Sequence, residues 1–154
     1  LTPAELKLKT SSNNAIQTIN KLLELNLIPI INENDSTATD EIKFGDNDLL
    51  AAKIAKLFKA NLLIMLSTVE GLYKEKDEID SNQSLIINKI RKIDSKIRQM
   101  ANDKDIAGKG GMKSKLLAAE ACMQNKCDVV ITSGLHPNPI KRIFEKNTAT
   151  WFKK

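Results

Sequence analysis

Apolar and polar positions follow one another along this chain in blocks that predict helices and strands in turn. Segments with apolar residues three and four positions apart are typical of amphipathic helices, and short continuous apolar runs are typical of strands. On this basis helices are predicted over residues 11–26, 46–60, 95–103, 113–126 and 138–147. Strands are predicted over residues 27–31, 61–67, 128–134 and 148–152.

The order of these elements indicates the fold class. Helices and strands alternate, which favours a three-layer α/β sandwich with a mainly parallel sheet. Residues 61–67 are apolar throughout, as expected of a strand that is buried on both faces. The chain contains no internal repeat, low-complexity tract or flexible linker. Residues 1–154 are therefore predicted to form a single domain.

Composition and charge narrow the classes of function. The 154 residues are 42% hydrophobic, which is enough for one core, and the net charge of +5 is spread among acids. Scattered basic residues and 4% aromatics argue against a nucleic-acid binder. No apolar run approaches the roughly 18 residues of a membrane span, and no signal-peptide pattern is present. Cys122, Cys127 and the single His136 have no metal-site spacing, so idle thiols in a reducing cytoplasm are expected.

A glycine- and lysine-rich stretch, GKGGMKSK, precedes the predicted helix over residues 113–126. Gly108, Gly110 and Gly111 would let consecutive N–H groups face one ligand, and a helix that begins near Met112 would add its positive end. The spacing is not that of a Walker A loop. Taken alone, the stretch fits a phosphate-binding loop and a flexible turn into a basic helix equally well.

Two other polar segments follow predicted strands, where open parallel sheets bind ligands. Residues 32–48 are rich in acids and amides, but the pattern does not match an EF-hand calcium loop. This segment could hold the amino and carboxylate groups of a substrate, or it could be a solvated loop with a helix cap at Asp46. Ser67 and Thr68 follow the second strand, and their hydroxyls alone indicate little.

The three segments in this order, however, resemble the amino acid kinase family. PIINENDSTATDEIKFGDNDLLAAKIA, LLIMLSTVEGLY and GKGGMKSKLLAAEAC together are similar to the glutamate kinases of that family, more than to its acetylglutamate, aspartate or uridylate kinases. The resemblance covers nearly the whole chain and implies a carbamate kinase-like fold. It also implies transfer of the γ-phosphoryl group of ATP to the γ-carboxylate of L-glutamate, giving γ-glutamyl phosphate for proline biosynthesis.

The resemblance implies roles for particular residues. Asn34, Asp35 and Asn47 would bind glutamate, Asp48 would organise the catalytic lysines, and Lys115 would stabilise the phosphoryl group in transfer. Mg²⁺ would bridge the ATP phosphates, with no dedicated protein metal site. A homo-oligomer without a nucleic-acid or membrane partner is expected. ATP contacts are implied for Ser67, Thr68, Lys109, Gly110, Gly111, Met112, Lys113, Ser114 and Lys115.

The sequence also departs from the family pattern. Ser67-Thr68 stands where the family usually has Thr-Asp, and Lys109 replaces a hydroxyl residue in the glycine-rich loop. The family's N-terminal lysine and phosphate loop do not appear, nor does a C-terminal RNA-binding-like domain. The chain is therefore predicted to be the second half of the catalytic domain, with little activity alone. Another amino acid kinase, such as an acetylglutamate kinase, and a nucleotide-binding module without catalysis are the alternatives.

Overall fold

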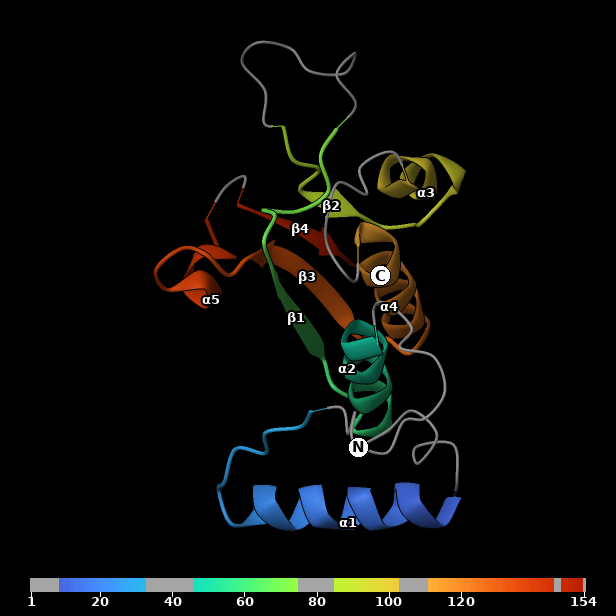
Figure 1. Ribbon diagram of the computed structural model, residues 1–154, viewed down its shortest axis with the longest axis vertical. Helices are drawn as coiled ribbons and strands as arrows, with labels where there is room; N and C mark the ends of the chain where they lie inside the picture. The colour runs from blue at the N-terminus through green and yellow to red at the C-terminus, as the bar shows by residue number, and fades with distance from the viewer. Residues whose placement is uncertain (1–8, 33–45, 75–84, 103–110, 146–147, 154) are drawn as a thin grey trace.

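The computed structural model describes residues 9–32, 46–74, 85–102, 111–145 and 148–153, which form a mixed sheet flanked by helices (Figure 1). Helices α2, α3 and α4 lie on one side of the sheet, and α5 lies on the other. The helices are α1 (Lys9–Glu24), α2 (Asp46–Leu57), α3 (Ser95–Asn102), α4 (Met112–Gln124) and α5 (Pro139–Arg142). The strands are β1 (Leu62–Ser67), β2 (Lys89–Ile90), β3 (Asp128–Ser133) and β4 (Ala149–Phe152).

The four strands are arranged in the order β1-β3-β4-β2. The β1–β3 and β2–β4 pairs are parallel, and β3–β4 is antiparallel. In the parallel pair at one edge, Leu62 lies opposite Asp128 and Ser67 lies opposite Ser133. The prediction of a mainly parallel sheet is confirmed, since two of the three strand pairs are parallel. The pairing of β1 with β3 also places the carboxyl ends of these two strands side by side.

The main core lies between the sheet and the helices α2, α3 and α4. β3 supplies Val129 and Ile131, which are fully buried, as the β-branched sequence of this strand favours. On the helical side, small alanines belong to the same core and let α2 and α4 pack closely together. These alanines are Ala52 and Ala55 of α2 and Ala118 and Ala119 of α4. Close packing of these two helices is what brings their first turns into contact.

Three helices end in the same way, with a residue in the left-handed conformation two positions after the last helical residue. These residues are Asn26, Lys59 and Lys126, with φ angles of 56°, 49° and 62°. In each case the next N–H bonds back across the last turn, as from Leu27 to the Leu22 carbonyl at 2.9 Å. This is the hydrogen-bond pattern of a Schellman motif. The prediction that Asn26 terminates the first helix is confirmed.

Residues 27–31 do not form the predicted strand. A strand needs backbone partners, and no strand of the described chain lies beside this segment. Pro29 also lacks an N–H group to donate to a neighbour. As a result Ile28 and Ile30, which sit on alternate positions, are 90% and 96% exposed. The segment has the apolar composition of a strand, but within the described residues no neighbouring strand pairs with it.

Other differences from the sequence-based expectations concern the sheet edges and α5. The prediction that residues 61–67 are buried on both faces is wrong: Leu66 of β1 is 50% exposed because β1 is an edge strand. The two-residue strand β2 was not predicted, since it contains one apolar residue among charged ones. The helix expected over residues 138–147 spans only Pro139–Arg142, and residues 143–145 are not helical.

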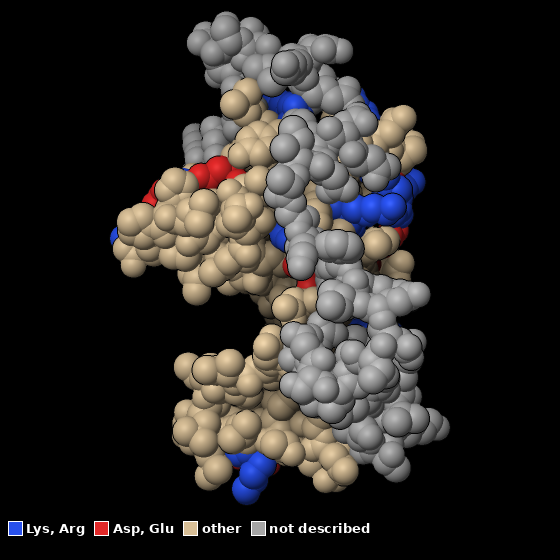
Figure 2. Space-filling view, in the orientation of Figure 1, with Lys and Arg blue, Asp and Glu red and all other residues tan. Residues whose placement is uncertain are grey.

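Helix α1 lies away from the sheet, beyond the end of α2 (Figure 1). The space-filling view shows the surface hollowed between the part built on α1 and the part built on the sheet (Figure 2). On this face lysine and arginine form only a small part of the described surface, and they lie mainly at its margins.

Candidate active site

The first turns of α2 and α4 meet at one carboxylate, that of Asp48. The Nζ atom of Lys115 lies 3.1 Å from Asp48 Oδ2 and 3.5 Å from Oδ1. The hydroxyl of Ser114 lies 2.6 Å from the same Oδ2 atom. The Lys115 and Asp48 side chains are only 14% and 19% exposed. The structure thus joins the two residues that the sequence assigned to catalysis, in a site that is largely shielded from water.

The charges at this site favour an anionic ligand. A carboxylate in the first turn of a helix is stabilised by the helix dipole, which suits Asp48 at the start of α2. A lysine at the same end of a helix is disfavoured, and α4 carries two in its first turn, Lys113 and Lys115. Because α4 has no acidic residue in its first turn, Asp48 of the neighbouring helix supplies a counter-charge. The remaining positive potential would attract a phosphate group.

Gly111 is the N-cap residue of α4 and, within the described residues, gives the first turn of this helix no side-chain cap. The residue is extended, with φ −60° and ψ −176°, and has no side-chain oxygen for the N–H groups that follow. Its carbonyl accepts the N–H of Ser114 at 3.1 Å. Uncapped N–H groups at a helix start are a common binding site for phosphate. The predicted glycine-to-helix transition at Met112 is confirmed, and its binding of ATP stays a prediction.

Ser67 and Thr68 occupy the predicted position at the end of β1. Ser67 lies opposite Ser133, and its carbonyl accepts the N–H of Gly134 at 2.8 Å. Ser67 is partly buried and Thr68 is exposed. The hydrogen bonds of the Asp48 cluster run between α2 and α4, whereas the bond from the Ser67 carbonyl runs to the residue after β3. The helix starts and the strand ends are thus two separate groups of residues. That one nucleotide contacts both groups stays a prediction.

Several predicted ligand-binding residues lie outside the described residues. They are Asn34 and Asp35, which are predicted to bind glutamate, and Lys109 and Gly110, which are predicted to bind ATP. Asn47 is described and exposed, directly before Asp48 in the first turn of α2. Its binding of glutamate stays a prediction.

A second charged cluster, which the sequence did not indicate, lies at the ends of β1 and β3. The carboxylate of Glu70, just after β1, contacts the His136 Nε2 atom after β3 and lies 3.6 Å from Arg142 Nη2 of α5. Glu70 Oε2 is buried and has no hydrogen bond within the described residues. The His136 side chain is 42% exposed. No local pattern identifies this cluster, because Glu70 and His136 are 66 positions apart.

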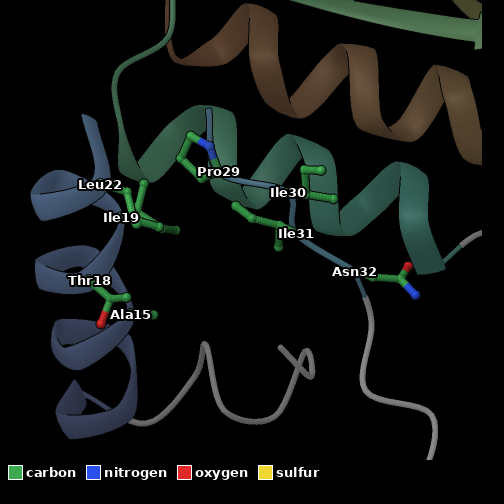
Figure 3. Close-up of a pocket in the computed structure, with 8 residues that line it drawn as sticks. All are labelled: Ala15, Thr18, Ile19, Leu22, Pro29, Ile30, Ile31 and Asn32. Atoms are coloured by element: carbon green, nitrogen blue, oxygen red, sulfur yellow. The ribbon is translucent and has the colours of Figure 1, made fainter. Parts of the chain in front are cut away.

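A pocket of about 280 Å³ lies between α1 and residues 29–32 (Figure 3). Ile19 and Leu22 point into it from α1, toward Ile31. Thr18 and Asn32 are its only polar residues among the described lining, and none of that lining is charged. The described lining therefore offers none of the charged groups that glutamate binding requires. Its lining consists of Ala15, Thr18, Ile19, Leu22, Pro29, Ile30, Ile31 and Asn32.

Three further properties of the described chain concern metals, membranes and cysteines. No group of three or more histidine, cysteine or acidic side chains lies close enough to hold a metal ion. None of the described helices combines the length and apolarity needed to cross a membrane. Cys122 and Cys127 are both free and buried. Burial raises the pKa of the Cys122 thiol to about 12, and the adjacent Cys127 adds to this shift.

Comparison with known proteins assigns a family. The model of the amino acid kinase family matches residues 2–133. A glutamate 5-kinase of Pelagibacter ubique is 45% identical over 154 residues, covering 99% of this chain and 41% of the relative. A glutamate 5-kinase of Dinoroseobacter shibae is 43% identical over 141 residues, covering 90% of this chain and 38% of the relative. The chain thus spans about two-fifths of the length of these curated relatives.

A solved structure is similar in fold. The UMP kinase of Ureaplasma parvum superposes with a TM-score of 0.54 at 21% sequence identity. The match covers 90% of this chain and 52% of that protein. At this identity the likeness concerns the arrangement of the sheet and helices alone.

Proposed function

The chain belongs to the amino acid kinase family, and on that basis we propose that it forms part of an ATP-dependent kinase for the γ-carboxylate of L-glutamate. The relatives at 43–45% identity support this substrate, since they are glutamate 5-kinases. The product is γ-glutamyl phosphate, an acyl phosphate that feeds proline biosynthesis. The proposal includes a cytoplasmic location and a homo-oligomeric state.

The observation that carries the proposal is the contact between Lys115 and Asp48 at the start of α4. A phosphoryl group in transfer carries negative charge on its oxygens, so fixed cations and N–H groups provide most of the catalysis. Lys115 supplies the cation, and Asp48 holds it at 3.1 Å in a largely buried position. Because Asp48 lies on another helix, the lysine is fixed before ATP binds.

The nucleotide binds along the glycine-rich loop and the start of α4. Gly111, Met112 and Lys113 place backbone N–H groups and a flexible cation at the phosphates. Ser67 and Thr68, at the end of β1, contact the rest of the nucleotide. Glutamate binds on the opposite side of Asp48, held by Asn47. Asn34 and Asp35 complete the glutamate site, and Lys109 and Gly110 complete the ATP loop.

Mg²⁺ fits this site only as a partner of the nucleotide. Asp48 is the one carboxylate of the described cluster, and its Oδ2 atom already accepts bonds from Ser114 and Lys115. Mg²⁺ commonly keeps several water ligands and binds through substrate phosphates. The side chains present therefore suit a metal carried by ATP phosphate oxygens and water. Bound there, the ion would neutralise part of the phosphate charge.

We also propose that this chain forms the second half of the catalytic domain; its 41% share of one relative's length supports its being a part of a longer enzyme. In the experiments below, 'complete enzyme' means this chain together with the proposed first half of the catalytic domain. The isolated 154-residue chain should show almost no glutamate-dependent ADP production. Substantial turnover by the isolated chain would contradict this division of the site.

The test of the function is a substrate panel on the complete enzyme with ATP and Mg²⁺. ADP production should depend on L-glutamate, and hydroxylamine should trap the acyl phosphate product as a hydroxamate. Preference for N-acetylglutamate would replace the proposed substrate, and nucleotide binding without turnover would support a non-catalytic module. Asp35→Ala should raise KM for glutamate about tenfold or more, as expected when a substrate loses a charged partner. A change confined to KM for ATP would reverse the assigned halves.

A further inference from the structure

The Ser114 hydroxyl faces two acceptors and has one proton to share between them. Its Oγ atom lies 2.6 Å from Asp48 Oδ2 and 2.9 Å from the carbonyl oxygen of Gly111. A serine hydroxyl donates one hydrogen bond, and an ionised carboxylate can only accept. An oxygen pair at 2.6 Å would repel without a proton between the two atoms. The hydroxyl proton therefore points at Asp48, and the contact with Gly111 is secondary.

This bond fixes the carboxylate that holds the catalytic lysine. Asp48 Oδ2 accepts from Ser114 and from Lys115, whereas Oδ1 is 3.5 Å from Lys115. With one oxygen tied to the first turn of α4, rotation of the carboxylate is restricted. Ser114 and Lys115 are neighbours on α4, so the helix presents a donor pair to one acceptor. Charge-assisted bonds of this kind are roughly twice as strong as neutral ones.

Resting on the proposed kinase function, we propose that Ser114 is a positioning residue that acts on phosphoryl transfer through Asp48. Its hydroxyl holds the Asp48 carboxylate in the orientation that places Lys115 at the transferred phosphoryl group. This role differs from direct contact with ATP, which the glycine-rich loop as a whole suggests. It also differs from a local role in the first turn of α4, where the hydroxyl would serve the Gly111 carbonyl.

The first test compares Ser114→Ala and Ser114→Thr in the complete enzyme. Ser114→Ala should lower kcat about tenfold, the effect expected when one bond to a charged group is lost, and change KM for ATP less than about twofold. Ser114→Thr keeps a hydroxyl and should restore most of the rate. Ser95→Ala, an exposed serine that begins α3, is the matched control and should leave both constants unchanged. A raised KM for ATP with unchanged kcat would overturn the proposal in favour of an ATP contact.

A double-mutant cycle with Asp48→Ala separates positioning from a local structural role. If Ser114 acts through Asp48, Ser114→Ala should cause no further loss of kcat in the Asp48→Ala background. An equal loss in both backgrounds would assign the effect to Gly111 or the helix turn and would overturn the proposal. The same cycle in free energies of unfolding needs no turnover and should show the same coupling; additive effects there would also overturn it.

The proposed function and this inference fail in distinguishable ways. Absence of glutamate-dependent ADP production by the unmodified complete enzyme would remove the proposed function. The cycle in unfolding free energies would still show whether Ser114 and Asp48 are coupled. An active enzyme whose kcat is the same with and without the Ser114 hydroxyl would remove only the positioning role.

Discussion

The Nζ atom of Lys115 lies 3.1 Å from Oδ2 of Asp48, although the two residues are 67 positions apart in the chain. Each residue stands in the first turn of its helix, and packing of α2 against α4 brings the two turns together. The pair is largely shielded, so its electrostatic interaction is stronger than that of an exposed pair. This contact gives the candidate site its geometry, and the neighbouring residues can be tested against it.

Lys113 provides a contrast with Lys115 on the same turn of α4. Lys113 is exposed, so we expect it to attract the ATP phosphates without a fixed place at the transferred group. Lys113→Ala in the complete enzyme should raise KM for ATP a few-fold, about 1 kcal/mol of binding, and leave kcat within about twofold. Steady-state kinetics at varied ATP and saturating glutamate measures both. A loss confined to kcat would place Lys113 among the catalytic groups instead.

Glu70 should stabilise the turn after β1 through its contacts with His136 and Arg142. Glu70→Gln keeps the shape of the side chain and removes its charge. Because the three side chains are partly exposed, we expect a loss of only about 1 kcal/mol in the free energy of unfolding. Urea denaturation measures it, and Glu145→Gln, at an exposed position, is the control. Equal stabilities of the two variants would show that the cluster contributes nothing.

Gly71 lies against the start of β4 with no room for a side chain. A Cβ atom there would overlap the Thr150 hydroxyl and lie 3.0 Å from the Thr150 backbone nitrogen. The same hydroxyl accepts the N–H of Leu72 at 2.8 Å in a buried position. Gly71→Ala should therefore destabilise the protein by roughly 1–3 kcal/mol.

Gly134→Ala is the matched control for this steric prediction. The nearest atom to a Cβ at that position would be Leu66 Cβ at 3.2 Å, on a half-exposed side chain at the sheet edge. A smaller loss is expected, since a Cβ at Gly134 would have one close neighbour at 3.2 Å, whereas a Cβ at Gly71 would meet three atoms at 3.0 Å or less. Thermal denaturation of both variants ranks them, and equal or reversed losses would contradict the packing around Gly71.

The Cys122 thiol should make stability depend on alkaline pH. Burial raises its pKa from 9.0 to about 12, so between these values the folded chain retains a proton that the unfolded chain loses. Its contribution is complete below about pH 9 and is lost as the pH rises toward 12, by at most about 1.4 kcal/mol per pH unit. Denaturation at about pH 8 and about pH 10 should show a shallower decline for Cys122→Ala. Identical declines would contradict the shift.

Much of the architecture could be predicted because the spacing of apolar residues along the chain reflects which side chains are buried. The helical spacing before Asn26 and the β-branched run of β3 each indicated the right element. Part of the candidate site could also be predicted, because ligands commonly bind at the ends of parallel strands, and the segments that precede Asp48 and Lys115 were expected at such positions. The resemblance to the kinase family supplied the two residues, Asp48 and Lys115. Their hydrogen bond needed the packing of the two helices.

The remaining features depend on contacts that composition does not encode. Residues 27–31 have strand composition, but strand formation requires a partner, which the described residues do not provide. Leu66 was expected to be buried and is half exposed, because an apolar run does not show whether its strand lies at an edge. The bond from Ser114 to Asp48 and the contact between Glu70 and His136 each join residues 66 positions apart. Local patterns carry no information about such pairs.

The most direct test of the central claim is the glutamate-dependent turnover of the complete enzyme with Lys115 replaced by alanine. The unmodified enzyme should form ADP and γ-glutamyl phosphate in equal amounts. Lys115→Ala should lower kcat by about 100-fold or more while KM for ATP changes less than about fivefold, because the cation acts on the charge of the transition state. Unchanged kcat in a folded Lys115→Ala enzyme would contradict the catalytic role of the Lys115–Asp48 pair.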